Sequence, residues 1–247
     1  MRIFKPAIAL FALAATLLAH PARAAEKVDL LLVLASDVSR SVDQPKFQLQ
    51  REGYAAAISN PRVLDAIRSG PHGRIAICFL EWSGVGNQKV VIDWTLIDGA
   101  EAAQRFGDQL IELPRSFADR TSISGGIDFA VAQFANAPQQ STRRTIDVSG
   151  DGTNNSGRDV TAARDDALKQ NITINGLVIL SDRPLAWNPE HTNPPGGLGN
   201  YYKTNVIGGP GAFVMVAENF NSFGNAIIGK LIAEIAQTPA PQRSASR

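Results

Sequence analysis

The sequence feature that most constrains the fold is a nearly uninterrupted apolar run, VDLLLVLA, at residues 28–35. A strand with one face in water alternates apolar and polar residues, whereas this run is apolar at almost every position. It therefore predicts a central strand covered on both faces, as in parallel sheets flanked by helices. A helical stretch follows from about Asp43 to Ile67, and Pro61 is expected to break it because the residue before a proline disfavours helix.

The remaining segments continue this alternation of strands and helices. Two apolar runs, RIAICFLEW and KVVIDWTLI, are separated by SGVGNQ and predict a hairpin, hence an antiparallel strand at the edge of the sheet. Helices are expected at 98–113 with Asp98 as the N-cap, from Thr121, at 157–170 and at 220–236. Further strands are expected at IDVS, ITINGLVIL and AFVMVA. The predicted fold class is α/β, a doubly wound and mostly parallel sheet with helices on both faces.

Both ends of the chain differ in character from this pattern. Arg2 and Lys5 precede the apolar stretch IALFALAATLLA, and small residues precede a cut after Ala24, which is typical of a cleavable signal peptide. We therefore expect a signal peptide at 1–24, one domain at 25–237 and a disordered tail at 238–247. The mature protein is expected to be periplasmic or secreted.

The Pro-, Gly- and Asn-rich segment 181–211 is expected to be a long irregular connection, with a partner surface as the alternative.

Charge and cysteine content narrow the possible partners. The chain has 24 Lys and Arg against 23 Asp and Glu, and loss of three basic residues with the leader leaves 21, a formal net charge of −2. This balance gives no reason to expect nucleic acid as a partner. Cys78 is the single cysteine, so no intrachain disulfide can form. The near-neutral charge is compatible with a monomer, and the sequence does not fix the oligomeric state.

Carboxylates and hydroxyls interrupt the apolar pattern at three places. Asp37, Ser39 and Ser41 follow the first strand in ASDVSRSVD. Thr121 stands at the entry to the helix that carries SGG, and Asp151 follows the strand IDVS in VSGDGTNNSG. A doubly wound sheet gathers the loops after its parallel strands at one edge, so we expect these side chains to lie near one another.

These motifs carry a family resemblance. Asp-x-Ser-x-Ser, a lone Thr before a small-residue helix and an Asp-Gly pair after a later strand together resemble the metal-ion-dependent adhesion site (MIDAS) of von Willebrand factor type A (VWA) domains. The resemblance covers the mature chain to about Ala236, and the order of strands agrees. RRTIDVSGDGTNNSG and YYKTNVIGGPGAF are similar to a branch of exported bacterial proteins in that superfamily whose function is not established.

The resemblance implies a ligand set for one divalent cation. Ser39, Ser41 and Thr121 would supply oxygens, while Asp37 and Asp151 would contribute negative charge directly or through water. Oxygen donors suit Mg²⁺ best, with Mn²⁺ or Ca²⁺ as alternatives. Two carboxylates among neutral hydroxyls barely neutralise such an ion, so it should stay electrophilic toward a carboxylate of a partner protein. The predicted function is thus an exported, metal-dependent protein-binding module.

Simpler interpretations exist for each of these residues. Ser39 or Asp43 could cap the helix that follows, Thr121 could cap its own helix, and Asp151 with Gly152 is a common turn signal. Asp147, between Ile146 and Val148 in a predicted central strand, must be paired, hydrogen-bonded or protonated if it is buried. We interpret Asp147 as a structural partner rather than a metal ligand.

Other function classes have less support in the sequence. A metal-dependent phosphoryl-transfer or nucleotide-binding enzyme is one alternative, but neither G-x-G-x-x-G after the first strand nor G-x-x-x-x-G-K occurs. The mature chain has two histidines, His72 and His191, both in predicted loops, and shows no Ser/His/Asp set or His/Cys zinc cluster. We therefore predict that the protein is not an enzyme. A metal-free protein-interaction scaffold is the remaining alternative.

Overall fold

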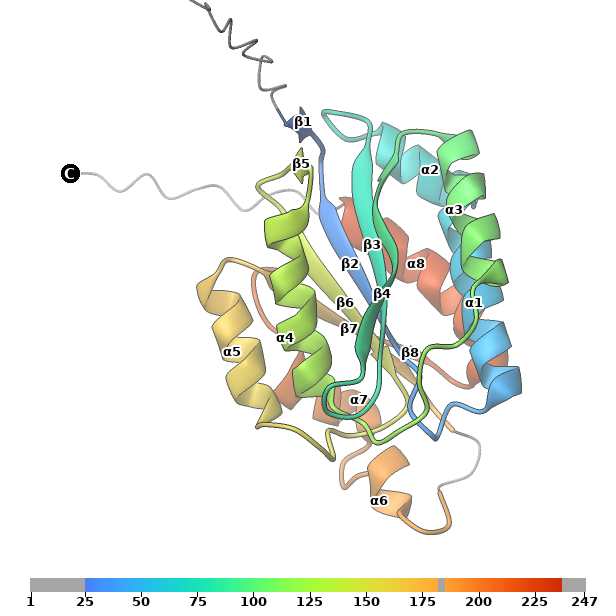
Figure 1. Ribbon diagram of the computed structural model, residues 1–247, viewed down its shortest axis with the longest axis vertical. Coiled ribbons are helices and arrows are strands. Elements are labelled where there is room, and N and C mark those ends of the chain that lie inside the picture. The colour runs from blue at the N-terminus through green and yellow to red at the C-terminus, as the bar shows by residue number, and fades with distance from the viewer. Residues whose placement is uncertain (1–24, 182–184, 237–247) are drawn as a thin grey trace, which may run out of the picture.

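The fold is built on a central six-stranded sheet. The computed structural model describes residues 25–181 and 185–236 (Figure 1). The strand order is β4-β3-β2-β6-β7-β8, with β4 antiparallel to β3 and the other pairs parallel. The strands are β2 (Leu31–Asp37), β3 (Ile75–Trp82), β4 (Gln88–Ile97), β6 (Arg144–Gly150), β7 (Thr173–Ile179) and β8 (Val214–Ala217). The predicted doubly wound sheet with one antiparallel edge strand is therefore confirmed.

Two very short strands form a separate parallel pair that the sequence did not predict. They are β1 (Glu26–Lys27) and β5 (Gln139–Gln140). Each has two residues, too few for a periodic pattern to be visible in the sequence. The expected leader at 1–24 and tail at 238–247 lie outside the described residues.

The helices follow the predicted order, with differences at their ends. The longer ones are α1 (Gln44–Ile58), α2 (Pro61–Arg68), α3 (Ala100–Glu112), α4 (Ile123–Gln133), α5 (Val160–Lys169) and α8 (Phe223–Ala236). Pro61 starts α2, so the predicted break is confirmed. The prediction of Asp98 as an N-cap is wrong, because Gly99 holds that position and makes no side-chain capping bond.

The segment 181–211 is more regular than expected. It contains α6 (Pro189–Thr192), α7 (Leu198–Tyr201) and the single turn η2 (Tyr202–Val206). Two further single turns, η1 (Phe134–Asn136) and η3 (Phe220–Ser222), adjoin α4 and α8. Tyr202 and Val206 are fully buried, which anchors this segment against the sheet despite its Pro- and Gly-rich sequence.

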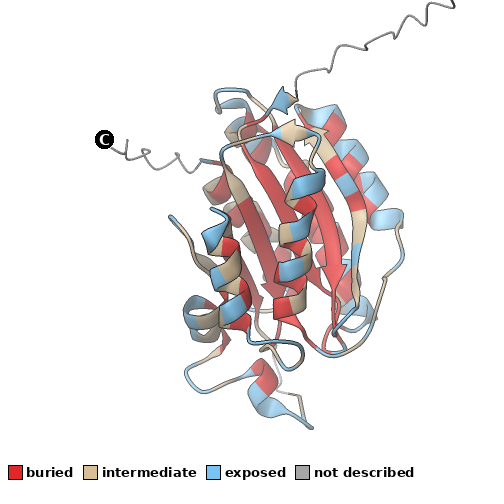
Figure 2. Cartoon of the chain, turned by 60° about the vertical axis from the view of Figure 1, so that its left-hand side comes forward, coloured by how far each residue is buried: buried red, intermediate tan, exposed pale blue. Residues whose placement is uncertain are grey.

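Helices cover both faces of the sheet, and each face has its own apolar core. Leu32 and Leu34 of β2 point into a core shared with α1, α2, α3 and α8. Leu31 and Val33 point into a second core shared with α4, α5 and η2. Successive side chains of a strand point to opposite faces, which explains why the whole run is apolar. Figure 2 shows the resulting pattern, buried strands between helices whose outer faces are exposed.

The SGG sequence allows α4 to approach the sheet closely. A Cβ on Gly126 would lie 2.9 Å from the ring of Trp82, the last residue of β3. A larger residue would push α4 away from the strand, since cores are close-packed. Thr121 lies just before α4, so this contact also places Thr121 at the end of the sheet where β2 and β3 terminate.

A charged cluster is buried beneath α8. Lys230 Nζ lies 2.8 Å from Asp147 Oδ1 and also forms an ion pair with Glu234, and all three side chains are fully buried. Asn175 donates a hydrogen bond to Glu234 Oε1 at 2.8 Å. The interpretation of Asp147 as a structural partner is confirmed by this pairing.

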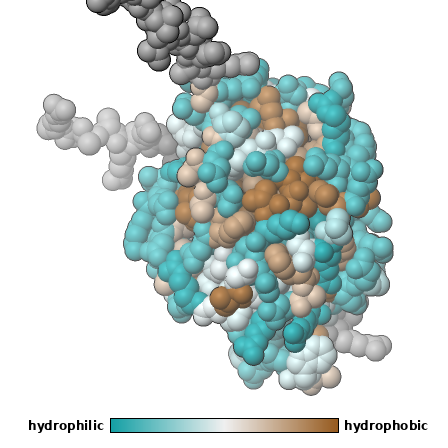
Figure 3. All heavy atoms as spheres, viewed as in Figure 1, coloured by the Kyte–Doolittle hydropathy of each residue, from teal (hydrophilic) through white to brown (hydrophobic). Residues whose placement is uncertain are grey.

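Hydrophilic residues cover most of the face shown in Figure 3, and hydrophobic ones gather across its centre, where Figure 1 draws β4 between α3 and α4. β4 is the edge strand and several of its residues are only half-buried.

Among the residues that the structure describes, no helix combines the length and apolar character needed to cross a bilayer.

Candidate metal centre

Asp37 is the last residue of β2 and is fully buried. Its Oδ1 accepts a hydrogen bond from the Ser39 backbone N–H at 2.7 Å, which turns the chain back over the strand end. Its Oδ2 has no hydrogen-bond partner among the described residues. The Ser39 and Ser41 hydroxyls lie 3.1 Å apart, so the Asp-x-Ser-x-Ser segment gathers three oxygen-bearing side chains at the carboxyl end of the central strand.

Asp151 directly follows β6, the neighbour of β2, and reaches the same place. Ser41 Oγ donates to Asp151 Oδ1 at 2.5 Å, which joins two clusters that are 110 residues apart in the sequence. Asp151 Oδ2 has no hydrogen-bond partner within the described part of the chain. The nearest ammonium, Lys46 Nζ, lies 3.7 Å from that oxygen. Two of the three predicted clusters are therefore in direct contact.

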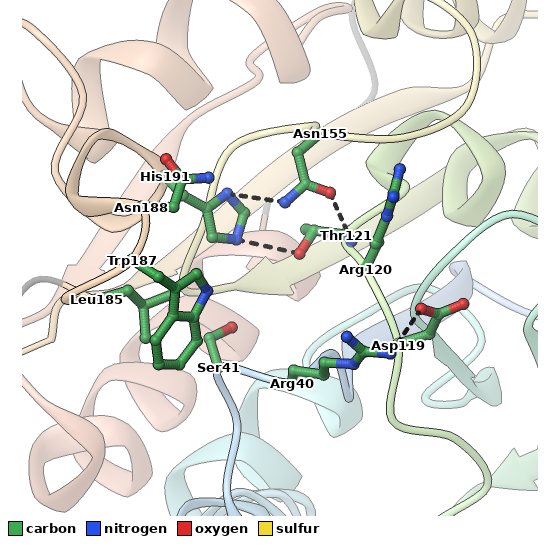
Figure 4. Close-up of a pocket in the computed structure, with 10 residues that line it drawn as sticks. All are labelled: Arg40, Ser41, Asp119, Arg120, Thr121, Asn155, Leu185, Trp187, Asn188 and His191. Carbon is green, nitrogen blue, oxygen red and sulfur yellow. Dashed lines mark hydrogen bonds and ion pairs between the residues drawn. The ribbon is translucent and has the colours of Figure 1, made fainter.

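Thr121 is held against the Asp151 loop by Asn155. The Thr121 backbone N–H donates to Asn155 Oδ1, and the Thr121 carbonyl accepts from the Asn155 backbone N–H, both at 2.9 Å. Thr121 and Ser41 line one cavity of about 320 Å³ (Figure 4). The structure thus brings the third cluster to the same edge, although Thr121 Oγ1 contacts His191 rather than the two carboxyl groups.

Helix capping does not explain these hydroxyls. Asp43, not Ser39, caps α1 by accepting from the Lys46 N–H, and Ser122, not Thr121, caps α4 by accepting from the Gly125 N–H. The capping alternatives for Ser39 and Thr121 are therefore wrong. Neither hydroxyl is used to cap a helix.

Burial and mutual repulsion dominate the electrostatics of the site. Burial raises the pKa of Asp37 to about 8, and the nearby Asp151 carboxyl adds to this shift. Burial also raises the pKa of Asp151, and the Ser41 hydrogen bond and Lys46 only partly offset it. Arg115 donates to the backbone carbonyls of Val38 and Ser39, so it fixes this loop without contacting either carboxylate. Among the described residues, Asp37 therefore has no ion pair, and Asp151 has only the long one to Lys46, at 3.7 Å.

The donor set fits a hard divalent cation. Asp37 Oδ2 and Asp151 Oδ2 are buried oxygens without hydrogen-bond partners among the described residues, and the Ser39 and Ser41 hydroxyls lie beside these carboxyl groups. The Thr121 side chain lines the same cavity as Ser41. A buried unpartnered carboxylate is costly, and a cation with oxygen ligands removes that cost. The described residues contain no group of three or more His, Cys, Asp or Glu side chains that could hold a metal ion. A cation held by two carboxylates and by hydroxyls does not require such a group of three.

Two residues near the site were not predicted from the sequence, Lys46 in the first turn of α1 and His191 in α6. Asn155 lies in the quoted NNSG stretch, which predicts a loop after Asp151 but not the contact of Asn155 with Thr121. The position of His191 at the edge of the sheet could not be predicted, because the segment around it has no periodic pattern.

The wall of the cavity formed by 185–191 includes an exposed aromatic residue. Trp187 is 76% exposed, although it lines the same cavity as Ser41 and Thr121. Figure 4 shows Trp187 and His191 on one side of the cavity, facing Arg40, Arg120 and Thr121. Burial lowers the pKa of His191, which favours the neutral imidazole.

Comparison with known proteins agrees with this architecture. Proximal thread matrix protein 1 from the mussel byssus, solved with a zinc-occupied MIDAS motif, is 14% identical over 85% of this chain and 49% of its own, with a TM-score of 0.58. BatB from Bacteroides thetaiotaomicron is 18% identical over 85% of this chain and 100% of its own, with a TM-score of 0.53. A von Willebrand factor type A protein from Catenulispora acidiphila is 14% identical over 84% of this chain and 43% of its own, with a TM-score of 0.55.

At these identities the likeness establishes the fold, which is that of VWA domains. The chain spans about half the length of the mussel protein. No curated protein matches the sequence. A family model described as "Protein of unknown function (DUF1194)" matches residues 27–239. The chain belongs to that family.

Proposed function

We propose that this protein is an exported binding module in which a divalent cation links it to a carboxylate of a partner protein. The cation would be held by Asp37, Ser39, Ser41, Thr121 and Asp151. The observation that carries the proposal is the pair of buried carboxyl groups, each with one oxygen that has no hydrogen-bond partner among the described residues, beside the Ser39 and Ser41 hydroxyls. Two carboxylates only just neutralise a bound dication and the hydroxyls add no charge, so the ion would attract one more carboxylate.

The donor chemistry supports a divalent ion rather than a monovalent one. Oxygen donors alone favour Mg²⁺, Mn²⁺ or Ca²⁺, and a small site that retains waters favours Mg²⁺ among these. The mussel protein carries zinc in its MIDAS motif, which supports the view that this fold can hold a divalent ion at this edge. The bound ion would supply an electrophilic centre, and the chain's own residues would position it and exclude bulk water.

The surroundings of the cavity favour an acidic partner. Arg40 and Arg120 are exposed and line the cavity, and Asp119, which pairs with Arg40 at 3.6 Å, is the acidic residue beside them. Exposed guanidinium groups near a site steer acidic ligands toward it and repel basic ones. Trp187 offers an apolar contact at the same rim, and aromatic residues are enriched at protein interfaces.

Export rests on the sequence of the first 24 residues. We propose that the leader is removed after Ala24 and that the mature protein acts in the periplasm or outside the cell. Intact mass measurement of protein recovered from the periplasmic fraction tests this directly. A mass that includes residues 1–24 would contradict cleavage.

A calorimetric titration tests the proposed function. The protein is titrated with Mg²⁺, and a Glu-containing peptide is then added in Mg²⁺ and in EDTA. We expect one ion per chain and peptide binding that EDTA abolishes. Asp37→Asn should lose both, whereas Asp65→Asn, an exposed carboxyl in α2, should keep both. Peptide binding that is unaffected by EDTA would favour a metal-free scaffold, and absence of any response to Mg²⁺, Mn²⁺ and Ca²⁺ would contradict the proposal.

A further inference from the structure

His191 is a buried imidazole at the proposed metal site. Its residue is only 5% exposed, and α6 brings it from a segment 40 residues beyond Asp151 in the sequence. Figure 4 shows the ring pointing toward Thr121 and Asn155. The MIDAS-like motifs contain no histidine, so His191 is not one of the ligands that they imply.

The distance between His191 and Thr121 suits two ligands of one ion. His191 Nε2 lies 3.1 Å from Thr121 Oγ1. Ions with metal–ligand distances of about 2.0 to 2.1 Å place neighbouring ligand atoms roughly 3.0 to 3.3 Å apart, for octahedral and tetrahedral geometry respectively. The Ser39 and Ser41 hydroxyls show the same 3.1 Å spacing. His191 Nε2 therefore extends the set of donor atoms at a separation that a metal ion can bridge.

The surrounding residues hold the imidazole in this orientation. A Cβ at position 152 would lie 2.2 Å from His191 Nε2, so Gly152 leaves the space that the ring occupies. The Thr153 backbone N–H donates to the His191 carbonyl at 2.9 Å, which fastens α6 to the Asp151 loop. The loop that carries one predicted ligand thus also positions His191.

The other ring nitrogen has the contacts expected of a metal-binding histidine. Nδ1 lies 3.2 Å from Thr153 Oγ1, a hydroxyl that can accept a hydrogen bond from Nδ1–H. In that tautomer the lone pair is on Nε2. The Asn155 amide nitrogen lies farther away, at 3.4 Å, and would favour the opposite tautomer. Such partners of the second nitrogen commonly fix the orientation and tautomer of metal-bound histidines.

We infer that His191 Nε2 is a ligand of the cation, so the site is a mixed nitrogen and oxygen site that prefers Zn²⁺ to the Mg²⁺ that its oxygen donors alone would favour. Imidazole suits zinc and other late divalent ions, whereas Mg²⁺ and Ca²⁺ prefer oxygen donors. This inference rests on the proposed function, because it refines the choice of ion at the same site. If Asp37 or Asp151 acts through water, one coordination position of the ion remains for a carboxylate of the partner.

Competition titrations with a metal-binding dye test the inference. Affinities for Zn²⁺ and Mg²⁺ are measured for the parent, His191→Ala, His191→Gln and His72→Gln, with the fold of each variant checked by circular dichroism. We expect the parent to prefer Zn²⁺, and both His191 variants to lose at least about tenfold in Zn²⁺ affinity with Mg²⁺ affinity changed less than about threefold. His72→Gln, which alters an exposed histidine outside the site, should match the parent.

X-ray absorption of the zinc-loaded parent gives a second readout that needs no variant. Imidazole scattering from one histidine is expected, and a zinc shell of oxygen atoms alone would overturn the inference even if a His191 variant failed to fold. Equal Zn²⁺ affinity in parent and His191→Ala would overturn it while leaving the proposed function intact. Tighter binding of an acidic peptide by His191→Ala with unchanged Zn²⁺ affinity would show that His191 competes for the site instead. A parent that binds no divalent ion would overturn both.

Discussion

Two buried acidic clusters in this protein differ in where their counter-charge comes from. In the core cluster, Asp147 and Glu234 share Lys230, whose ammonium lies 2.8 Å from Asp147 and is fully buried with them. In the edge cluster, Asp37 and Asp151 have no cation in comparable contact. Each cluster contains two carboxyl groups, so the contrast lies in the cation and not in the number of acids.

The lysine nearest the edge cluster makes its hydrogen bond with another group. Lys46 Nζ lies 3.7 Å from Asp151 Oδ2 but donates to the Ser41 carbonyl at 2.8 Å and lies over the Phe220 ring at 4.9 Å. Its side chain is 24% exposed. The core cluster therefore carries its cation within the fold, whereas the edge cluster is complete only with one from outside. The first arrangement stabilises structure, and the second creates a binding site.

Removing the internal cation should produce the largest effect. Lys230→Met leaves two buried carboxyl groups without their ammonium, which costs about 3 to 5 kcal/mol in the free energy of unfolding. Urea unfolding measures this loss, and Lys169→Met, at an exposed lysine, is the control. Divalent ions should not restore the lost stability. A loss below about 1 kcal/mol would show that the core cluster does not depend on Lys230.

Removing one carboxylate from each cluster should separate their responses to metal. At an ion concentration 100 times the dissociation constant, a divalent ion is expected to stabilise the parent by about 2.7 kcal/mol. Asp37→Asn should lose that gain while its metal-free form becomes more stable by about 1 to 3 kcal/mol, because an uncharged amide replaces a buried carboxyl whose Oδ2 has no hydrogen-bond partner among the described residues.

Asp147→Asn is the matched variant for this test. It should retain the full stabilisation by divalent ions, since Asp147 lies in the core cluster with Lys230. Thermal unfolding with and without Mg²⁺ or Zn²⁺ measures both variants. Loss of the metal response in Asp147→Asn, or its survival in Asp37→Asn, would remove the distinction between the clusters.

The order and class of the elements could be predicted from the sequence because each depends on local pattern. The run at 28–35 is apolar on both faces because helices cover both faces of β2. The helical stretch is broken before Pro61 as expected, since the proline ring acts on its immediate neighbour. Asp98 failed as an N-cap because the helix begins after Gly99, and such a shift of one residue depends on packing rather than on local sequence.

The candidate site could be predicted only in part. Asp37, Ser39, Ser41 and Asp151 lie together because the ends of adjacent parallel strands meet at one edge of the sheet. His191 could not be found in this way, because its place depends on the path of an irregular segment and on the space beside Gly152. Side-chain contacts between distant segments leave no periodic trace in either segment.

The pH dependence of stability should also distinguish the clusters. Burial raises the pKa of Asp37 to about 8 and that of Asp147 to about 7, the latter despite Lys230. Each folded carboxyl holds its proton more tightly than the unfolded one, whose pKa is 3.8. The free energy of unfolding of the metal-free protein should therefore fall as the pH rises from about 4 to about 8.

A divalent ion should remove only the part of this decrease in the free energy of unfolding that comes from Asp37, because the ion takes the place of the proton on that carboxyl. Urea unfolding at several pH values with and without the ion measures the difference. Metal stabilisation should grow as the pH rises toward 8, and Asp37→Asn should show no such growth. Metal stabilisation that is the same at pH 5 and pH 8 would contradict the assignment of Asp37 to the site.

The smallest expected effect concerns the distant ammonium. Lys46→Met removes a positive charge 3.7 Å from Asp151 Oδ2, so it should strengthen divalent-ion binding by about 1 kcal/mol, roughly fivefold. Calorimetric titration measures the change, and Lys169→Met again serves as the control. Weaker ion binding in Lys46→Met would mean that Lys46 shapes the site rather than competes for it.

The central claim is that the edge cluster holds one divalent ion from outside the protein. Equilibrium dialysis followed by elemental analysis counts that ion directly, without assuming its identity. We predict about one divalent ion per chain in the parent and in Asp147→Asn, and none above background in Asp37→Asn. A parent without bound metal, or an Asp37→Asn variant that retains as much as the parent, would contradict the account.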